Sequence, residues 1–417
     1  MQKSLLVQNR IQLAMLAGVV ALYGSTALPQ SAQPGSEVVV DLGTLILESG
    51  TVADELKDKI QAAAGAADVI GREQYEQIPT PTVADAVATV PGVIVQEFFG
   101  GNDQPRIQIR GSGIQQSPTE RGLLVLQNGM PVNRADGSYI VGLATPGNAE
   151  AIEVWRGAAA NRLGASVLGG AVNFISPTAI TDPGTRLRFQ GGSFGQLGAY
   201  GQTSIIGERA STLFQFELNE KDGFRDLNNQ SHRYSFGANT TIQHSETAAT
   251  QVFLSYTDLE FGVPGPLTAA ALSADPSGIH PGPTVVGPGM IANPGPNVPR
   301  DLPRRKADQL LAGARTTFDI DESRFDLGLS ASNTNDSFRF PIAAGERVTD
   351  GWDATVSARY AFRPDAVKGL PLIEATLSHA FGQSDRSYFH NVGGARGPQF
   401  GENDLEASMS SLYLGAN

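Results

Sequence analysis

The sequence predicts an α+β domain followed by an antiparallel transmembrane β-barrel that is incomplete in this chain. Three observations lead to this fold class. The chain of 417 residues begins with an export signal, and no later apolar run is long enough for a membrane-spanning helix. Helical and strand patterns mix between residues 66 and 178. After Pro183, helical periodicity largely gives way to two-residue alternation.

The composition argues against several classes of protein. With no Cys, the chain cannot form a disulfide scaffold, a Cys-ligated zinc or iron–sulfur site, or a thiol nucleophile. A net charge of −12 argues against a general nucleic-acid binder, whose affinity depends on neutralising phosphates. The 5 His residues do not cluster, so we expect no metal site and no cofactor.

The first residues have the pattern of a secretory signal peptide. Lys3 and Arg10 precede an apolar run at 11–22, and small residues follow up to Ala27. Cleavage after Ala27 or after Ala32 fits this pattern. The alternative is a buried helix, because the run is shorter than the ~20 residues of a transmembrane helix. An exported protein without such a helix must cross a membrane with strands.

Residues 51–96 and 107–154 carry the patterns of a mixed domain. Apolar residues at helical spacing predict a helix over 51–64, and a second, capped helix is expected to start near Pro81 and to end before Pro91. Short strands are expected at 93–95, 107–109, 123–126 and 152–154. Asn128-Gly129 is a strong signal for a tight turn.

Alternation after Pro183 predicts a barrel with a lipid face and a wet lumen face. Phe214, Phe216 and Leu218, for example, alternate with polar residues at 215, 217 and 219. About ten strands follow from such runs. They lie near 184–192, 197–206, 211–220, 231–243, 249–261, 305–319, 323–333, 351–362, 371–383 and 403–414.

The connections between these strands give a second test. Short polar turns are expected at 207–210, 245–247, 321–323 and 363–369, and long loops at 262–303, 334–350 and 384–402. Short periplasmic turns that alternate with long outer loops are typical of outer-membrane barrels. A soluble β-sandwich, which also alternates, is the alternative.

A series of ordered motifs at 84–174 resembles the plug domain of TonB-dependent outer-membrane receptors. The motifs are Ala84-Asp85-Ala86-Val87, Val90-Pro91-Gly92-Val93, Ile109-Arg110-Gly111-Ser112-Gly113, and the segments 124–131, 152–157 and 163–174. The sequence pattern after 183, which includes Asp222-Gly223-Phe224-Arg225, is similar to that of receptors for iron complexes, including ferric siderophore and ferric citrate receptors. The resemblance divides the chain into a signal peptide (1–27), a flexible leader with a TonB box (28–64), a plug domain (65–180) and a partial transmembrane β-barrel (181–417).

The resemblance implies a barrel of roughly 22 strands that is plugged from the periplasmic side. The stretch Thr44, Leu45, Ile46, Leu47 and Glu48 looks like a TonB box, which would pair with TonB as an added strand. The alternative for 38–47 is the first strand of the plug. We expect about ten of the roughly 22 strands in this chain, so that the sequence would be a truncated record.

Two plug arginines are expected to form ion pairs inside the barrel. Arg110 and Arg156 each precede Gly. In the family that the chain resembles, such arginines pair with barrel carboxylates and lock the plug, since an unpaired buried charge is costly. The alternative is that both are solvated in the lumen.

Three outward plug loops are the expected ligand site: 98–104, 113–120 and 133–139. They offer amide, hydroxyl, charged and aromatic side chains, which suit oxygen-rich and often anionic iron complexes. The candidate ligand-binding residues are Phe98, Phe99, Gln115, Gln116, Asn133, Arg134, Asp136, Ser138 and Tyr139. Arg134 is the best single candidate for an anion, and a solvated loop residue is the alternative. Asp136-Gly137 could instead simply form a turn.

The sequence therefore predicts an outer-membrane receptor of a Gram-negative bacterium and not an enzyme. Gly111-Ser112-Gly113 is not a nucleophile elbow, and no Lys follows Gly169-Gly170 as in a phosphate loop. We expect a monomer in outer-membrane lipid that binds a ferric siderophore or ferric citrate and imports it with energy from TonB. The alternatives are the same fold importing cobalamin, another metal or a glycan, and an exported β-rich adhesin.

Overall fold

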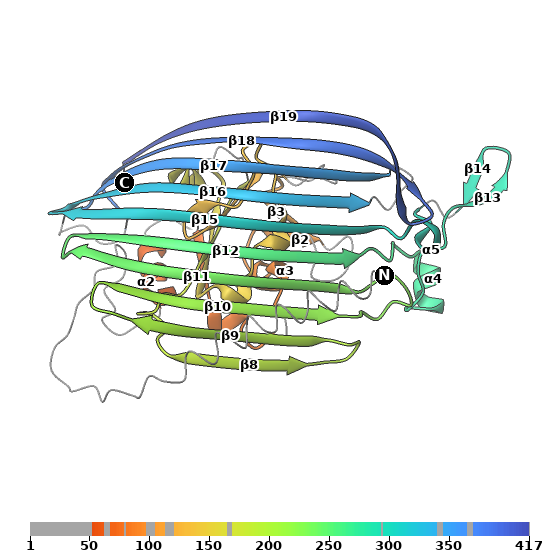
Figure 1. Ribbon diagram of the computed structural model, residues 1–417, viewed down its shortest axis with the longest axis horizontal. Coiled ribbons are helices and arrows are strands. Elements are labelled where there is room, and N and C mark those ends of the chain that lie inside the picture. The colour runs from red at the N-terminus through yellow and green to blue at the C-terminus, as the bar shows by residue number, and fades with distance from the viewer. Residues whose placement is uncertain are drawn as a thin grey trace. The chain divides into compact units, whose positions relative to one another are not determined.

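The computed structural model describes residues 52–61, 67–78, 81–96, 105–112, 121–164, 169–292, 295–339, 345–364 and 370–416 (Figure 1). The predicted signal peptide, the TonB box at 44–48 and the rest of the predicted leader up to residue 51 lie outside the described residues, whereas residues 52–61 of that leader are described and form a helix. In the described part of the chain, no helix is long and apolar enough to cross a membrane.

The part from α2 to β7, residues 52–175, forms the α+β domain that we call the plug. Its helices are α2 (Val52–Gln61), η2 (Arg72–Gln74), α3 (Val83–Val87), η3 (Val141–Leu143), η4 (Pro146–Asn148) and η5 (Gly157–Leu163). Its strands are β1 (Ala67–Gly71), β2 (Val93–Gln96), β3 (Arg106–Ile109), β4 (Leu123–Gln127), β5 (Met130–Pro131), β6 (Ala151–Arg156) and β7 (Gly170–Ile175). The expected helices and strands are present, and β1, β5 and β7 are additional.

Local sequence explains the boundaries of several plug elements. The side chain of Thr82 accepts a hydrogen bond from the backbone N–H of Asp85, and Asp85 returns one, which forms a capping box at the start of α3. Asn128 and Gly129 have φ of +52° and +79°, as the predicted tight turn between β4 and β5 requires.

The plug has a five-stranded sheet of order β1-β6-β7-β4-β5, in which only β4 and β7 are parallel. Helix α2 covers part of it, since Val52, Leu56 and Ile60 pack in one buried cluster with Leu124 and other sheet residues. The hairpin β2–β3 contributes to a second buried cluster on which α3 packs. The plug thus has an apolar core of its own.

Ten antiparallel strands form a single sheet that we call the wall (Figure 1). They are β8 (Thr185–Gly191), β9 (Leu197–Ile206), β10 (Ala210–Lys221), β11 (Ser231–Ser245), β12 (Ala248–Gly262), β15 (Arg304–Ile320), β16 (Ser323–Arg339), β17 (Glu346–Phe362), β18 (Ile373–Val392) and β19 (Ala395–Ala416). Each predicted strand is present. A β-sandwich would divide these strands between two sheets, so the sandwich alternative is wrong.

The alternation along the strands separates two faces of the wall. Gln215, Glu217 and Asn219 are buried on one face of β10, where Gln215 Nε2 donates to the backbone oxygen of Asn148 in the plug at 3.0 Å. This face is therefore the lumen side. The opposite face exposes large apolar side chains, among them Leu310, Leu327, Leu329, Val356 and Leu377. An apolar outer face is what contact with lipid requires.

Two of the three predicted long loops are wrong. Strands β16 and β17 extend to Arg339 and from Glu346, so residues 334–350 are mostly strand. Likewise β18 and β19 continue to a tight turn at Gly393-Gly394, within the predicted loop 384–402. These extensions lack a regular apolar face, since polar residues such as Asn333, Thr334 and Asn335 follow one another, yet their backbones remain paired.

The third predicted loop is present between β12 and β15. It contains the helices α4 (Ala269–Ala274) and α5 (Val298–Asp301), and the hairpin of β13 (Thr284–Gly287) and β14 (Met290–Ala292). The connections at the opposite end of the strands, such as Asp321-Glu322 between β15 and β16, are short. We therefore assign the end with the 263–303 loop to the outer side and the short-turn end to the periplasm.

Gly170 provides a test of the plug packing. Its φ is +149°, and a Cβ there would lie 2.1 Å from the backbone oxygen of Trp155. We expect Gly170→Ala to destabilise the plug by about 3 kcal/mol or more, through a clash with backbone that cannot move aside. The measurement is the temperature at which a protease begins to cleave the plug in the purified protein.

Gly137 is the matched control for this substitution. Its φ is +81°, but nothing lies within 4 Å of the position of its Cβ. Gly137→Ala should therefore cost only the about 1–2 kcal/mol of a left-handed alanine. Equal cleavage temperatures for the two variants would contradict the packing described for β6 and β7.

Candidate functional site

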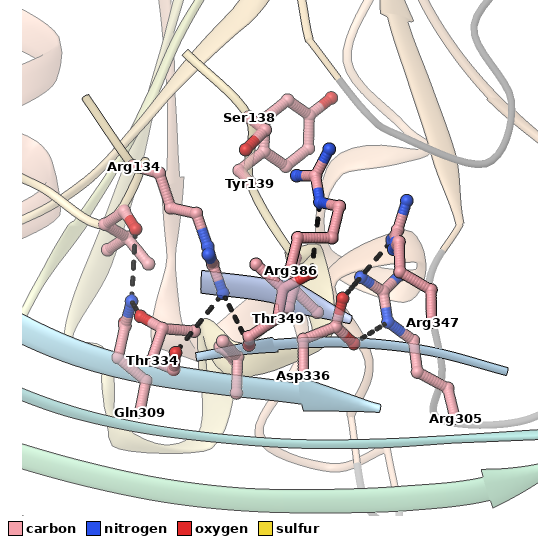
Figure 2. A pocket seen from close by; sticks show the side chains of 13 residues that line it. Arg134, Ser138, Tyr139, Arg305, Gln309, Thr334, Asp336, Arg347, Thr349 and Arg386 are labelled. Carbon is pink, nitrogen blue, oxygen red and sulfur yellow. Dashed lines mark hydrogen bonds and ion pairs between the residues drawn. The ribbon is translucent and has the colours of Figure 1, made fainter. Parts of the chain in front are cut away.

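A polar cavity of about 30 Å³ lies between the plug loop 133–139 and the outer ends of β15 to β18 (Figure 2). The side chains that line it come from both parts of the chain. They are Val132, Arg134, Ser138, Tyr139, Ile140, Leu143, Arg305, Gln309, Thr334, Asp336, Arg347, Thr349 and Arg386. We call this space the outer cavity.

Arg134 reaches from the plug to the wall. Its Nη2 donates to the backbone oxygens of Thr334 and Thr349, at 3.3 and 3.4 Å. Its Nη1 is buried and has no hydrogen-bond partner among the described residues. Burial lowers the pKa of Arg134, against the opposing effect of Asp336, Asp353 and Asp136. The guanidinium stays charged at neutral pH, because arginine is effectively always protonated in proteins.

Three wall arginines surround the same space (Figure 2). Arg305 forms a bidentate ion pair with Asp336, at 2.8 and 2.9 Å, and Arg347 Nη2 lies 3.4 Å from the same carboxylate. Arg386 donates from Nε to the hydroxyl of Thr349 at 3.3 Å. Within the described residues, no ion pair joins Arg386 or Arg134 to a carboxylate.

The lining of the outer cavity therefore has four arginines and one carboxylate, Asp336. A buried cation without a counter-charge is unfavourable, because desolvation is not compensated. An anion that enters the cavity would supply the missing acceptors, and arginine suits planar carboxylate or phosphate groups. Among the described residues, no group of three or more His, Asp or Glu side chains could hold a metal ion directly.

Other predicted residues of the loop 133–139 brace the loop itself. Asn133 is buried, donates to the backbone oxygens of Leu123 and Gly137, and accepts from the N–H of Val125 at 2.7 Å. Asp136 accepts from the backbone and hydroxyl of Ser138 and pairs with Arg121 at 2.7 Å. These groups present a fixed loop to the wall.

The pKa of Asp136 reflects this bracing. Burial alone would raise it, but the hydrogen bonds from Ser138 and the ion pair with Arg121 hold the pKa of Asp136 below its ordinary value. The Asp136-Gly137 pair does form a turn, since Gly137 N donates to the oxygen of Arg134 at 2.9 Å.

The structure places part of the predicted ligand set together. Arg134, Ser138 and Tyr139 line the outer cavity, and Tyr139 is also part of the buried core. Phe98, Phe99, Gln115 and Gln116 lie outside the described residues.

Sequence reasoning missed the wall arginines 305, 347 and 386. Arg347 and Arg386 lie in segments that were predicted to be loops. Arg305 shares the lumen face of β15 with Gln309, both buried, two positions being the repeat of a strand. Arg305 could have been identified from the sequence, because it lies an even number of positions from Gln309. That spacing puts both residues on the face opposite the exposed Leu310.

Arg110 and Arg156 differ from the expected pairing with barrel carboxylates. The ion pair that the structure shows for Arg156 is with Asp68 of the plug, at 2.7 Å, and Arg156 also donates to the oxygen of Pro91 at 2.5 Å. Arg110 is exposed, and its φ is +52°. Position 68 lies on β1 directly beside β6, which explains the local pairing of Arg156.

A different plug arginine forms a buried ion pair with the wall. Arg162 of η5 contacts Glu374 of β18, and their side chains are 6% and 0% exposed. Glu374 also accepts from Arg359 at 3.2 Å and from the Tyr413 hydroxyl at 3.3 Å. Thr376 donates to the backbone oxygen of Arg162 at 2.9 Å. The end of η5 is thereby fastened to β18.

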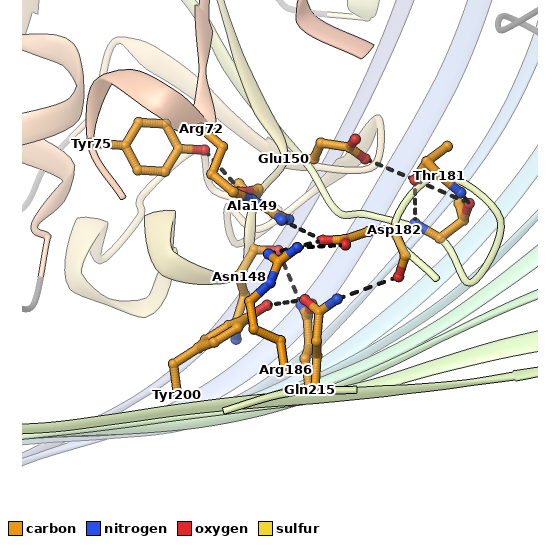
Figure 3. A network of polar contacts seen from close by, with 12 residues as sticks. Arg72, Tyr75, Asn148, Ala149, Glu150, Thr181, Asp182, Arg186, Tyr200 and Gln215 are labelled. Carbon is orange, nitrogen blue, oxygen red and sulfur yellow. Dashed lines mark hydrogen bonds and ion pairs between the residues drawn. The ribbon is translucent and has the colours of Figure 1, made fainter. Parts of the chain in front are cut away.

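A second polar junction ties the plug to the start of the wall (Figure 3). Arg72 contacts Asp182, which also accepts from Arg186 at 2.9 Å. Thr181 donates to Glu150 at 2.9 Å. Burial raises the pKa of Glu150 above its ordinary value, despite this hydrogen bond and the nearby Arg72. Residues 181–186 connect plug and wall, so this network fixes the point at which the chain passes from one to the other.

Comparisons with known proteins agree on one family. Residues 59–171 match the family model described as the TonB-dependent Receptor Plug Domain. The ferric enterobactin receptor PirA of Pseudomonas aeruginosa is 28% identical over 193 residues, which are 40% of this chain and 24% of that receptor. The vitamin B12 transporter BtuB of Vibrio vulnificus is 24% identical over 196 residues, which are 47% of this chain and 28% of the transporter.

Solved structures share the fold. The unliganded ferric citrate transporter FecA superimposes with a TM-score of 0.67 at 17% identity, over 87% of this chain and 54% of its own. The ferric preacinetobactin receptor BauA of Acinetobacter baumannii gives 0.61 at 15% identity, over 84% of this chain and 54% of its own. The chain thus spans about half the length of the solved relatives, and its matches to PirA and BtuB cover about a quarter of those proteins.

The Arg162–Glu374 pair gives a prediction on stability. Glu374→Gln would leave Arg162 and Arg359 beside a neutral amide in a buried site, and removing one partner of a buried pair costs about 3–5 kcal/mol. We expect the plug to become protease-sensitive at a lower temperature in the purified receptor. Glu260→Gln, which breaks the half-exposed pair with Arg304, should cost less than about 1 kcal/mol. Similar losses in both variants would refute the anchoring role.

Proposed function

The chain carries the plug domain of TonB-dependent receptors and a wall with the fold of their barrels, and from this premise we propose that it binds an anionic iron complex and imports it. The protein belongs to the outer membrane of a Gram-negative bacterium. Such receptors are transporters and not enzymes. The complex would be a ferric siderophore or ferric citrate, and energy for import would come from TonB.

The outer cavity is the observation that carries this proposal. Four arginines face one carboxylate there, and Arg134 Nη1 has no partner among the described residues. Carboxylate or phenolate oxygens at the edge of an iron complex are suitable acceptors for these donors. A cavity of about 30 Å³ has room for only one or two waters, so the arginines would hold an edge of the complex and not its whole body.

Coupling to TonB would follow from a shift between two states. Ligand bound at the loop 133–139 would favour the state in which the box at 44–48 is accessible, because a ligand can shift an equilibrium only by binding one state better. TonB would then pair with the box as an added strand, which uses backbone groups and depends little on side chains.

The alternative cargoes in the same fold are cobalamin, another metal and a glycan. The similarity to a vitamin B12 transporter keeps cobalamin open. An uncharged cargo would gain little from four arginines, so the charge of the outer cavity favours an anionic complex. An adhesin has no evident use for a plug that fills the lumen.

Arg386 gives a test of ligand binding. It has no carboxylate partner among the described residues, so Arg386→Gln should remove a charged donor and leave the fold intact. Loss of a hydrogen bond to a charged group costs about 1.5–3 kcal/mol, or a roughly 10- to 100-fold weaker Kd. The Kd is measured by titrating the purified receptor with ferric citrate and with a ferric siderophore.

Arg300 is the matched control for Arg386. It lies in the outer loop, 61% exposed, and pairs with its neighbour Asp301. Arg300→Gln should leave the Kd of the ferric complex unchanged. A receptor that binds cobalamin but neither iron complex would overturn the proposed cargo.

The predicted TonB box gives a second test of function. Deletion of residues 44–48 should abolish uptake of the ⁵⁵Fe complex by cells, while the Kd of the receptor for it stays the same, because force transmission and ligand binding use different parts of the chain. Unchanged uptake would show that the box lies elsewhere.

A further inference from the structure

A second and much larger cavity, of about 740 Å³, lies between the plug and the periplasmic half of the wall. We call it the inner cavity. Its wall side is formed by β11 to β19 near their short-turn ends, with Arg315, Thr317, Thr355 and Ser357 among its lining residues. This volume falls within the range of about 300–1,000 Å³ that small-molecule sites occupy.

The two cavities meet at Arg134. This side chain lines both the outer and the inner cavity. The neighbouring segment forms the rest of the partition, because Met130 packs against β16 at Gly328, where a Cβ would lie 2.4 Å from the Met130 Cε. Ala135 N donates to Asp353 of β17 at 2.7 Å. The turn from Met130 to Ala135 thus lies between the cavities along β15 to β17.

Arginines and carboxylates both line the inner cavity, but one of its arginines has no ion-pair partner among the described residues. Arg315 donates from Nη2 to Gln251 at 3.2 Å, and no ion pair joins it to a carboxylate in the described part of the chain. Glu153 of the plug is buried nearby and accepts from Asn173 at 2.9 Å. Burial raises the pKa of Glu153, which disfavours its anionic form. The electrostatic attraction between Glu153 and Arg315 is therefore weaker. Arg315 is therefore available to an anion.

The partition is also held to β15, because Gln309 donates to the oxygen of Val132 at 3.2 Å. Other contacts fasten plug and wall away from the partition. Asn148 donates to the Ser235 hydroxyl of β11 at 2.8 Å and accepts from Gln215 of β10 at 3.0 Å. Arg233 of β11 donates to the oxygen of Pro81 at 2.9 Å. None of these other contacts involves the segment 130–135.

We propose that the inner cavity is a second binding site for the same anionic iron complex, centred on Arg315. The complex reaches it when the segment 130–135 shifts from β15, β16 and β17, while the plug stays docked on β10 and β11. This proposal rests on the proposed function, because it takes the ligand of the outer cavity as its own.

Two cysteine pairs in the receptor test this. This chain has no native Cys, so introduced pairs in it have no internal competitor. Met130→Cys with Gly328→Cys fastens the partition to β16. Asn148→Cys with Ser235→Cys fastens the plug to β11. Each pair is joined by oxidation or by a short bismaleimide, and gel mobility confirms the link. Binding and uptake of ⁵⁵Fe-citrate by cells are then measured.

We expect both linked receptors to bind ⁵⁵Fe-citrate. The link at Met130 should abolish uptake, and reduction of its disulfide should restore it, whereas the link at Asn148 should leave uptake within about twofold of the unlinked receptor. Uptake blocked by the Asn148 link, or unaffected by the Met130 link, would overturn the proposal while the proposed function stands. A wild-type receptor that binds no ferric complex would instead refute the proposed function, and this proposal with it.

Arg315 supplies a separate readout for the inner site. Arg315→Gln should leave the Kd at the outer cavity unchanged and lower the maximal uptake rate at least about tenfold, with partial recovery in Arg315→Lys. Arg324→Gln is the matched control, because Arg324 lines the same cavity but is paired with Asp319 at 2.7 Å. An unchanged uptake rate in Arg315→Gln would contradict a site centred on this residue.

Discussion

The contact between plug and wall combines wall side chains that donate to the plug backbone with separate apolar clusters, such as that of Leu143 and Phe261. The donor and acceptor pairs include Arg233 with Pro81, Gln215 with Asn148, Asn239 with Pro177, and Gln309 with Val132, at 2.9 to 3.2 Å. Each such bond contributes about 1 kcal/mol, and each can break without the others. A plug held in this way can release one segment and keep the rest, whereas a continuous apolar seal would favour separation as a unit. The position of the outer cavity, the inner cavity and the turn between them all follow from where these bonds are made and where they are absent.

The alternation of the sequence predicted every wall strand but stopped short at the outer ends. Phe214 and Phe216 alternate with buried polar residues because one face meets lipid and the other meets the plug. Beyond the lipid no face needs to be apolar, so Thr334 and Asn335 could be read as loop although their backbones are paired. Periodicity therefore reports the lipid-embedded part of a strand, and hydrogen bonding alone decides where the strand ends.

Only the plug half of the candidate site could be predicted from the sequence. The loop 133–139 and Arg134 follow from plug motifs that are local in sequence. Their counterparts Arg305, Arg347 and Arg386 come from three different strands, and only the register of the sheet brings them to one place. The same limit explains Arg156, whose ion-pair partner Asp68 depends on the pairing of β1 with β6.

The length of the wall strands affects how a ligand arrives. Strands β15 to β19 have 17 to 22 residues, whereas about 9–11 residues are enough to cross a bilayer. The outer ends of these strands therefore stand above the hydrocarbon, although Arg305 and Arg347 are buried there around the outer cavity. In physiological salt the attraction of these arginines for an anion extends over roughly one Debye length, about 8 Å. Capture of a dilute anion is therefore a short-range event at the strand ends themselves.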